Sequence, residues 1–259
     1  MSATADQLAA ALPAPASRPS VLRRVALIAA GVPACGLPVI WGGGAAAMLL
    51  TGYEDDHRFH QVTGQGVLTG VLWLAGLLPL LVAGWRGRRP STAAGLQHLA
   101  FVAASLVAGL FVPGPGVVAL ALIIAVTGGL VWAALPLRPR LRGALGALDP
   151  ALAPVAALTA ALYVPFVLGQ RALQATSTDE HAQMTHYFDM AWVSLVLVAL
   201  ALVAAVAAGA RRLAVWSTVG TLVVGAARLG FTGELAWSSA AIAVGLAGTV
   251  VAVLRMRAV

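Results

Sequence analysis

The sequence predicts an all-α, polytopic membrane protein with about eight transmembrane helices arranged as two four-helix parallel repeats. Hydrophobic residues make up 60% of the chain and charged residues only 10%. The mean hydropathy is +0.91, whereas charged residues are about 25% of a typical soluble domain. A chain this apolar has too few polar side chains to cover a water-facing surface, so we expect the lipid bilayer to be its environment.

Eight apolar stretches are long enough to cross the roughly 30 Å of hydrocarbon in a bilayer. Their approximate bounds are 25–50, 66–84, 93–112, 116–135, 151–169, 191–210, 213–231 and 235–254. The preceding residues 1–20 are rich in Ala, Pro and Ser without periodicity, which predicts a disordered cytoplasmic tail. The spans then divide into two repeat units, 21–142 and 143–259.

The arginines indicate the orientation of these spans. All sixteen basic residues are Arg, and thirteen of them flank the spans on one side. The positive-inside bias assigns that side to the cytoplasm. We therefore expect a multi-pass protein of the cell membrane with both termini cytoplasmic. The same distribution explains the sequence pI of about 11.2 without nucleic acid as a partner.

The two halves of the chain resemble each other. Residues 37–42 (LPVIWG) correspond to 164–169 (VPFVLG), and residues 55–60 (DDHRFH) correspond to 179–186 (DEHAQMTH). Four spans return the chain to its starting side, so both halves have the same orientation. Both acidic-histidine segments then lie on the extracytoplasmic face, where they could meet near the axis that relates the halves.

Four of the five histidines lie in these paired segments, and they are the candidate ligands of a metal site. The preference of acids for helix N-termini explains the acidic residues of both segments, but it does not explain the histidines. Imidazole and carboxylate groups suit zinc, iron or copper. The candidate ligands are His57, His60, His181 and His186, with Asp56 and Glu180 as ligands or supporting carboxylates.

Helical spacing supports the pairing of carboxylates with imidazoles in each half. Asp56 and His60 stand four residues apart, and His186 and Asp189 stand three apart. Residues at these spacings share one face of a helix. The metal hypothesis depends on the two segments meeting in space.

One stretch resembles a known family. Glu54, His57 and Arg58 form a Glu-x-x-His-Arg stretch that is similar to the outer end of the second helix in heme A synthase, which is also a duplicated eight-helix membrane protein. The resemblance implies a heme facing the histidines of each half. The chain departs from that pattern because its fourth and eighth spans contain no His, and the second segment lacks the Arg.

Other functions are compatible with the same residues. The histidines could line the outer vestibule of a small transporter or permease for a small-molecule substrate, or they could be solvated groups that titrate near neutral pH. A non-catalytic subunit that binds a membrane-protein partner is a further alternative. Arg228 lies inside the seventh span and is expected to pair with Glu234, or with Asp189 instead. The sequence contains no phosphate-binding loop and no Gly-x-Ser-x-Gly elbow.

Overall fold

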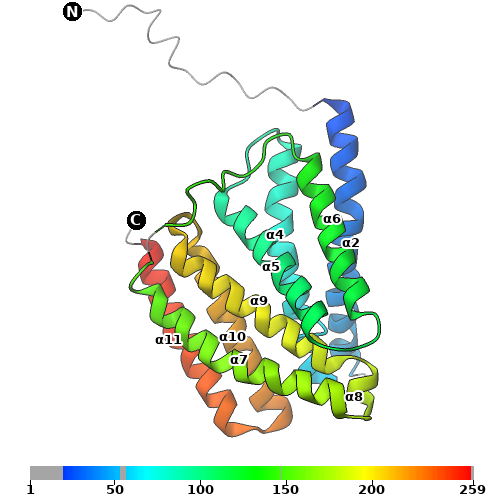
Figure 1. The fold of residues 1–259 in the computed structure, drawn as a ribbon, viewed down its shortest axis with the longest axis vertical. Helices are drawn as coiled ribbons and strands as arrows, with labels where there is room; N and C mark the ends of the chain where they lie inside the picture. Colours follow the sequence, from blue (N-terminus) through cyan, green and yellow to red (C-terminus); the bar gives the residue numbers. More distant parts are fainter. Residues whose placement is uncertain (1–19, 53–56, 147, 258–259) are drawn as a thin grey trace, which may run out of the picture.

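The computed structural model describes residues 20–52, 57–146 and 148–257. Within these ranges the chain is helical and has no β-strand (Figure 1). The elements are α2 (Val21–Thr51), α3 (Arg58–Val62), α4 (Val67–Trp85), α5 (Thr92–Phe111), α6 (Val117–Ala134), α7 (Leu152–Thr176), α8 (Glu180–Gln183), α9 (His186–Val206), η2 (Ala208–Ala210), α10 (Arg212–Thr232) and α11 (Leu235–Arg257). The expected N-terminal tail lies outside the described residues apart from Ser20, whose hydroxyl accepts a hydrogen bond from the Arg23 N–H.

Eight helical segments of the described chain are long and apolar enough to cross a membrane, which confirms the predicted all-α fold with about eight spans. Many large apolar side chains point outward, among them Ile40, Leu110 and Val126, which are 76%, 78% and 60% exposed. Such a surface would be an aggregation site in water, but it matches the acyl chains of a bilayer.

Two spans begin earlier than the sequence predicts. The second span was expected over 66–84, but the helical segment is Arg58–Trp85. The sixth was expected over 191–210, but α9 is His186–Val206. Both early turns carry polar side chains, which lowered the hydropathy on which the expectation was based. Those side chains are buried against protein, so the bilayer does not exclude them.

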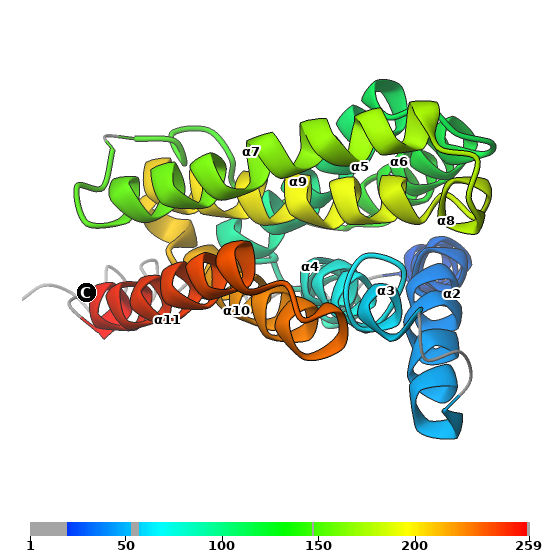
Figure 2. The same ribbon diagram turned by 90° about the horizontal axis from the view of Figure 1, so that it is seen from below.

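The helix contacts place the eight spans of the described chain in two groups of four, which can be followed in Figure 1. Helix α2 packs on α4 and α6, and α5 packs on α4 and α6. In the other group α7 packs on α9 and α11, and α10 packs on α9 and α11. The groups meet where α5 lies against α9 and where α10 lies against α3. Seen from below, α5, α6, α7 and α9 form one layer and α2, α3, α4, α10 and α11 the other (Figure 2).

The second span is broken between α3 and α4. The Thr63 hydroxyl donates to the Phe59 carbonyl at 2.6 Å, and the Thr69 hydroxyl donates to the Gly64 carbonyl at 2.7 Å. The Phe59 carbonyl also accepts from the Thr63 N–H at 3.1 Å, whereas the Thr69 hydroxyl gives the Gly64 carbonyl a partner at the break. A Cβ on Gly64 would lie 2.5 Å from the Asp189 carbonyl oxygen. Glycine at this position therefore allows the break to lie directly against α9.

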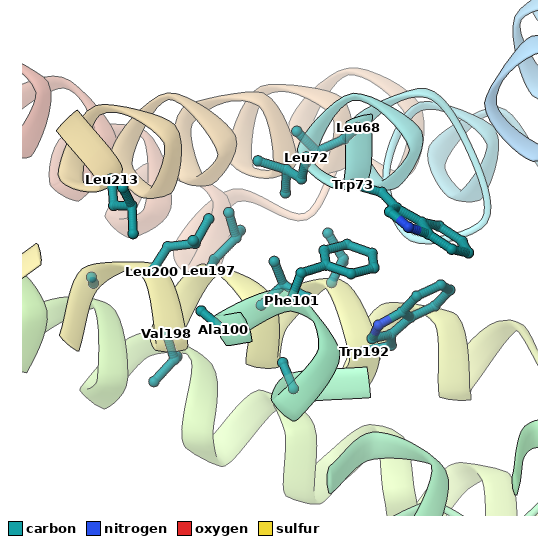
Figure 3. Close-up of a cluster of buried hydrophobic side chains, with 14 of the residues drawn as sticks. Leu68, Leu72, Trp73, Ala100, Phe101, Trp192, Leu197, Val198, Leu200 and Leu213 are labelled. Carbon is teal, nitrogen blue, oxygen red and sulfur yellow. The ribbon is translucent and has the colours of Figure 1, made fainter. Parts of the chain in front are cut away.

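The buried core between the groups is aromatic beneath the histidine segments. Trp73 and Trp192 are 3% and 1% exposed, and their ring centroids lie 6.2 Å apart. Phe101 lies beside both rings (Figure 3). The Trp192 indole N–H donates to the Ser105 hydroxyl at 2.8 Å, so the one polar atom of this large ring is satisfied. These contacts hold α4, α5 and α9 together beneath the histidine segments.

The opposite end of the molecule carries most of the arginines, and we call it the Arg-rich end. There Asp149 precedes α7 and accepts from Arg255 Nε at 2.8 and 3.1 Å. Arg211 Nε lies 3.1 Å from the same carboxylate. The Asp149 side chain is only 7% exposed. This network ties the start of α7 to the end of α11 and the start of α10.

Candidate metal centre

Four histidines from the two groups of helices meet at the end opposite to the arginines. His57 is the N-cap of α3, and His60 lies within that helix. His181 lies in α8, and His186 is the first residue of α9. We call these four residues the histidine cluster. The fold therefore brings together the two segments whose proximity the metal hypothesis requires.

The rings of the cluster lie in contact with one another across the boundary. The His57 ring stacks on His181 with centroids 5.1 Å apart, and it lies 5.0 Å from His186. The His60 ring lies 4.9 Å from His186 and 5.1 Å from His181. Each histidine of α3 thus faces both histidines of the other segment.

Three of these side chains can offer nitrogen atoms to one point. One ring nitrogen each from His57, His181 and His186 lies within 4.8 Å of the others. Tetrahedral coordination at a Zn–N distance of about 2.0–2.1 Å places ligand nitrogens about 3.3 Å apart. The rings therefore need to close by no more than about 1.5 Å to hold an ion of this size.

Burial of the histidine cluster is energetically unfavourable unless a further group binds its ring nitrogens. His57 and His60 are 8% exposed and His186 is 1% exposed. Among the described residues, both ring nitrogens of His186 and the Nδ1 atom of His60 lack a hydrogen-bond partner. A buried polar atom without a partner costs about 1–3 kcal/mol. A bound cation would replace those missing interactions.

His181 differs because it is partly exposed. Its neighbour Glu180 is exposed at the first position of α8 and is not one of the three residues whose ligand atoms converge. Asp56, the other predicted carboxylate, lies outside the described residues. The exposed side of His181 gives the cluster a route to the surrounding water.

A different carboxylate lies beneath the cluster. Asp189 stands one helical turn after His186 and is 2% exposed. Its Oδ1 atom has no hydrogen-bond partner among the described residues. Residues three apart share one face of a helix, so Asp189 lies on the face of α9 that carries His186, although no hydrogen bond joins the two side chains in the described chain. The i,i+3 spacing could identify this pairing, but only the fold shows that both residues are buried.

Gln174 on α7 fixes the segment that carries His181 and His186, and the sequence analysis did not identify it. Its amide nitrogen donates to the Ala182 carbonyl at 2.7 Å, and its amide oxygen accepts from the Phe188 N–H at 3.2 Å. One side chain thus holds both α8 and the first turn of α9. The sequence carries no signal for this role, because Gln174 follows Gln170 and Arg171 beyond the predicted end of the fifth span at residue 169.

Asp179 also holds the segment formed by α8 and the first turn of α9, from its exposed side. Its carboxylate caps α8 by accepting from the Ala182 N–H at 2.8 Å, and it accepts from the Tyr187 hydroxyl at 2.7 Å. The Tyr187 hydrogen bond, with the backbone N–H of Ala182, lowers the pKa of the Asp179 carboxyl. Asp179 is therefore occupied as a cap rather than directed at the histidine cluster.

The intramembrane arginine lies in the second group of helices. Arg228 Nε is 3.1 Å from a Glu234 carboxylate oxygen, and its guanidinium lies 5.0 Å from the rings of both Phe166 and Trp237. No ion pair joins it to Asp189 in the described chain. The aromatic faces and the carboxylate together account for a charge at this depth.

Comparison with known proteins gives no relative for this arrangement: no protein family, no curated protein and no solved structure matches the chain.

Proposed function

We propose that the protein is an integral membrane metalloprotein that binds one first-row transition-metal ion at the histidine cluster. The observation that supports this most is the convergence of ring nitrogens from His57, His181 and His186 within 4.8 Å. Two separate segments contribute these side chains. Surface histidines that only titrate have no reason to be buried together in this way.

The ligand chemistry limits the ion. Imidazole nitrogens suit zinc, copper and iron, and the only cysteine, Cys35, lies in α2 away from the histidine segments. Three histidines with one open position are typical of catalytic zinc rather than of closed structural sites. We infer that His57, His181 and His186 hold the ion and that His60, whose ring is 4.9 Å from His186, supplies a fourth ligand or a base.

A single ion fits the cluster better than a heme in each half. A heme needs its macrocycle between its axial ligands, whereas the four imidazole rings here contact one another directly. The rings also converge at the boundary between the two groups of helices rather than within each group. An ion held there supplies Lewis-acid or redox chemistry at a site open to water through His181.

The distribution of the arginines indicates which side of the membrane the metal centre faces. The histidine cluster lies at the end opposite to the Arg-rich end, and the positive-inside bias assigns the Arg-rich end to the cytoplasm. We therefore propose that the metal centre faces the extracytoplasmic side of the cell membrane. There it would serve an enzyme or redox reaction on a small molecule. The similar helix contacts of the two groups support descent from a duplicated four-helix unit.

The test is the metal content of untagged protein, purified in detergent without chelator and measured by mass spectrometry. We expect about one metal ion per chain in the wild type. We expect loss of that ion in the His57→Ala/His181→Ala double variant. The matched control is His98→Gln, because His98 is a buried histidine outside the cluster. Folded wild-type protein that takes up no zinc, copper or iron, even on reconstitution, would contradict the proposal.

A further inference from the structure

A groove toward the Arg-rich end lies between the two groups of helices, far along the spans from the histidine cluster. Its volume is about 610 Å³, within the range of small-molecule sites. Residues of α4, α5 and α10 line it: Val71, Leu74, Ala75, Leu78, Pro79, Gln97, Arg212 and Trp216. The lining is apolar except for one amide and one guanidinium.

The amide belongs to Gln97, which is 1% exposed. Neither its nitrogen nor its oxygen has a hydrogen-bond partner among the described residues. A buried amide in hydrocarbon without partners costs several kcal/mol, roughly as estimated for apolar transfer. The Gln97 side chain runs close to α4 because that helix has glycine at Gly76, where a Cβ would lie 3.4 Å from Gln97 Cγ.

The α4 wall of the groove contains a proline. Pro79 has no N–H, so the carbonyl of Ala75, four residues earlier, has no helical donor. Ala75 and Pro79 both line the groove. A ligand in the groove thus meets the Gln97 amide, which can both donate and accept.

The guanidinium belongs to Arg212, the first residue of α10. It is exposed and donates to the Ser91 hydroxyl at 3.2 Å, and it forms no ion pair with an acid in the described chain. Gln97 lies five residues into α5 and Trp216 four residues into α10, about 6–8 Å deeper than the helix starts. The groove therefore has the Arg212 guanidinium at its entrance, the Gln97 amide about 6–8 Å deeper and apolar side chains beyond the amide.

We propose that this groove binds one anionic phospholipid of the leaflet at the Arg-rich end. The phosphate pairs with Arg212, the glycerol-ester region meets Gln97, and an acyl chain lies along Leu74, Leu78 and Trp216. This order of charge, hydrogen-bonding groups and hydrocarbon is that of a phospholipid from its headgroup inward. The bound lipid fills the boundary between the groups of helices, and the proposal does not depend on the metal centre.

The test uses quenching of Trp216 fluorescence by phospholipids with brominated acyl chains, in reconstituted full-length protein. The Trp216→Phe variant identifies the part of the signal that comes from this residue. We expect brominated phosphatidylglycerol to quench it more strongly than phosphatidylcholine with the same chains. Arg212→Gln, at an exposed position that tolerates substitution, should lower the relative association constant for phosphatidylglycerol about fivefold.

Two further variants sharpen the result. Gln97→Leu should also weaken quenching by phosphatidylglycerol, because it removes the buried amide. Arg257→Gln makes the same charge change at an exposed residue of the Arg-rich end outside the groove, and it should leave the preference unchanged. Equal quenching by the two lipids in the wild type, or a preference that survives Arg212→Gln, would overturn the proposal.

Discussion

The rings of His57 and His181 stack face to face, with centroids 5.1 Å apart and an interplanar angle of 13°. One residue caps α3 in the first group of helices, and the other lies in α8 of the second group. An ion bound by an in-plane nitrogen of each ring would therefore join the two groups directly.

Asp189→Asn should weaken metal binding without removing it. The variant keeps the size of the buried side chain but replaces one carboxyl oxygen by an amide nitrogen, one helical turn after His186. Carboxylates that orient a ligating histidine typically contribute about 10–100-fold to metal affinity. We expect a loss of that size in a calorimetric titration, with unchanged stoichiometry.

The matched control for this variant is Asp179→Asn, which removes a carboxylate from the adjacent turn. Asp179 caps α8 and bonds Tyr187, so metal affinity should change little. Equal affinities of Asp189→Asn and the wild type would exclude a role for Asp189 in the metal centre.

Gly64→Ala should destabilise the contact between the helix break and α9. The new Cβ would lie 2.5 Å from backbone atoms of Asp189, which cannot move as a flexible side chain could. Overpacking of this kind costs about 1–3 kcal/mol. Thermal unfolding in detergent, followed by tryptophan fluorescence, should show a lower midpoint. Gly169→Ala is the control, because nothing lies within 4 Å of its new Cβ; an equal loss in both variants would contradict this account.

Asp149→Asn should lower stability at neutral pH, but the loss should disappear in acid. Burial acts to raise the pKa of Asp149, but hydrogen bonds from Arg255 and the Ala151 N–H outweigh it, so the pKa lies below its usual value. Such a carboxylate stabilises the fold fully above its unfolded pKa of about 3.9. That contribution is lost as pH falls through the lower, folded value.

We therefore expect Asp149→Asn to cost roughly 1–3 kcal/mol at pH 7, since it removes the charge that faces Arg211 and Arg255 and one of the two oxygens that accept from Arg255 Nε. Unfolding midpoints measured at falling pH should begin to converge for the variant and the wild type below about pH 4, and they should meet only below the depressed pKa of folded Asp149. A stability difference that stays constant across this range would show that the charge of Asp149 is not what matters.

The membrane fold could be predicted because the bilayer imposes length and apolarity on every span. The errors lay where a span carries polar residues that protein covers. Gly64 and Gly66 interrupt the second span, and His186 and Asp189 begin the sixth, so hydropathy placed both starts too late. The hydropathy of a segment indicates how well it fits the lipid, but it does not indicate which of its residues contact other helices.

The candidate site could be predicted only in part. The similar segments of the two halves indicated which histidines would meet, because matched positions of a parallel repeat are expected to lie near the axis of that repeat. Glu180 was included with them, but it is exposed at the start of α8. The support from Gln174 and the burial of Asp189 depend on contacts between α7, α8 and α9 that no local pattern contains.

X-ray absorption at the metal edge of loaded wild-type protein tests the central claim most directly, because it counts the atoms bound to the ion. The account predicts three or four nitrogen ligands at about 2.0–2.1 Å for zinc, with the outer-shell scattering of imidazole rings. The His57→Ala/His181→Ala variant should lose that signal. A first shell of oxygen without imidazole scattering, or a spectrum unchanged in the double variant, would contradict the assignment of the histidine cluster as the metal centre.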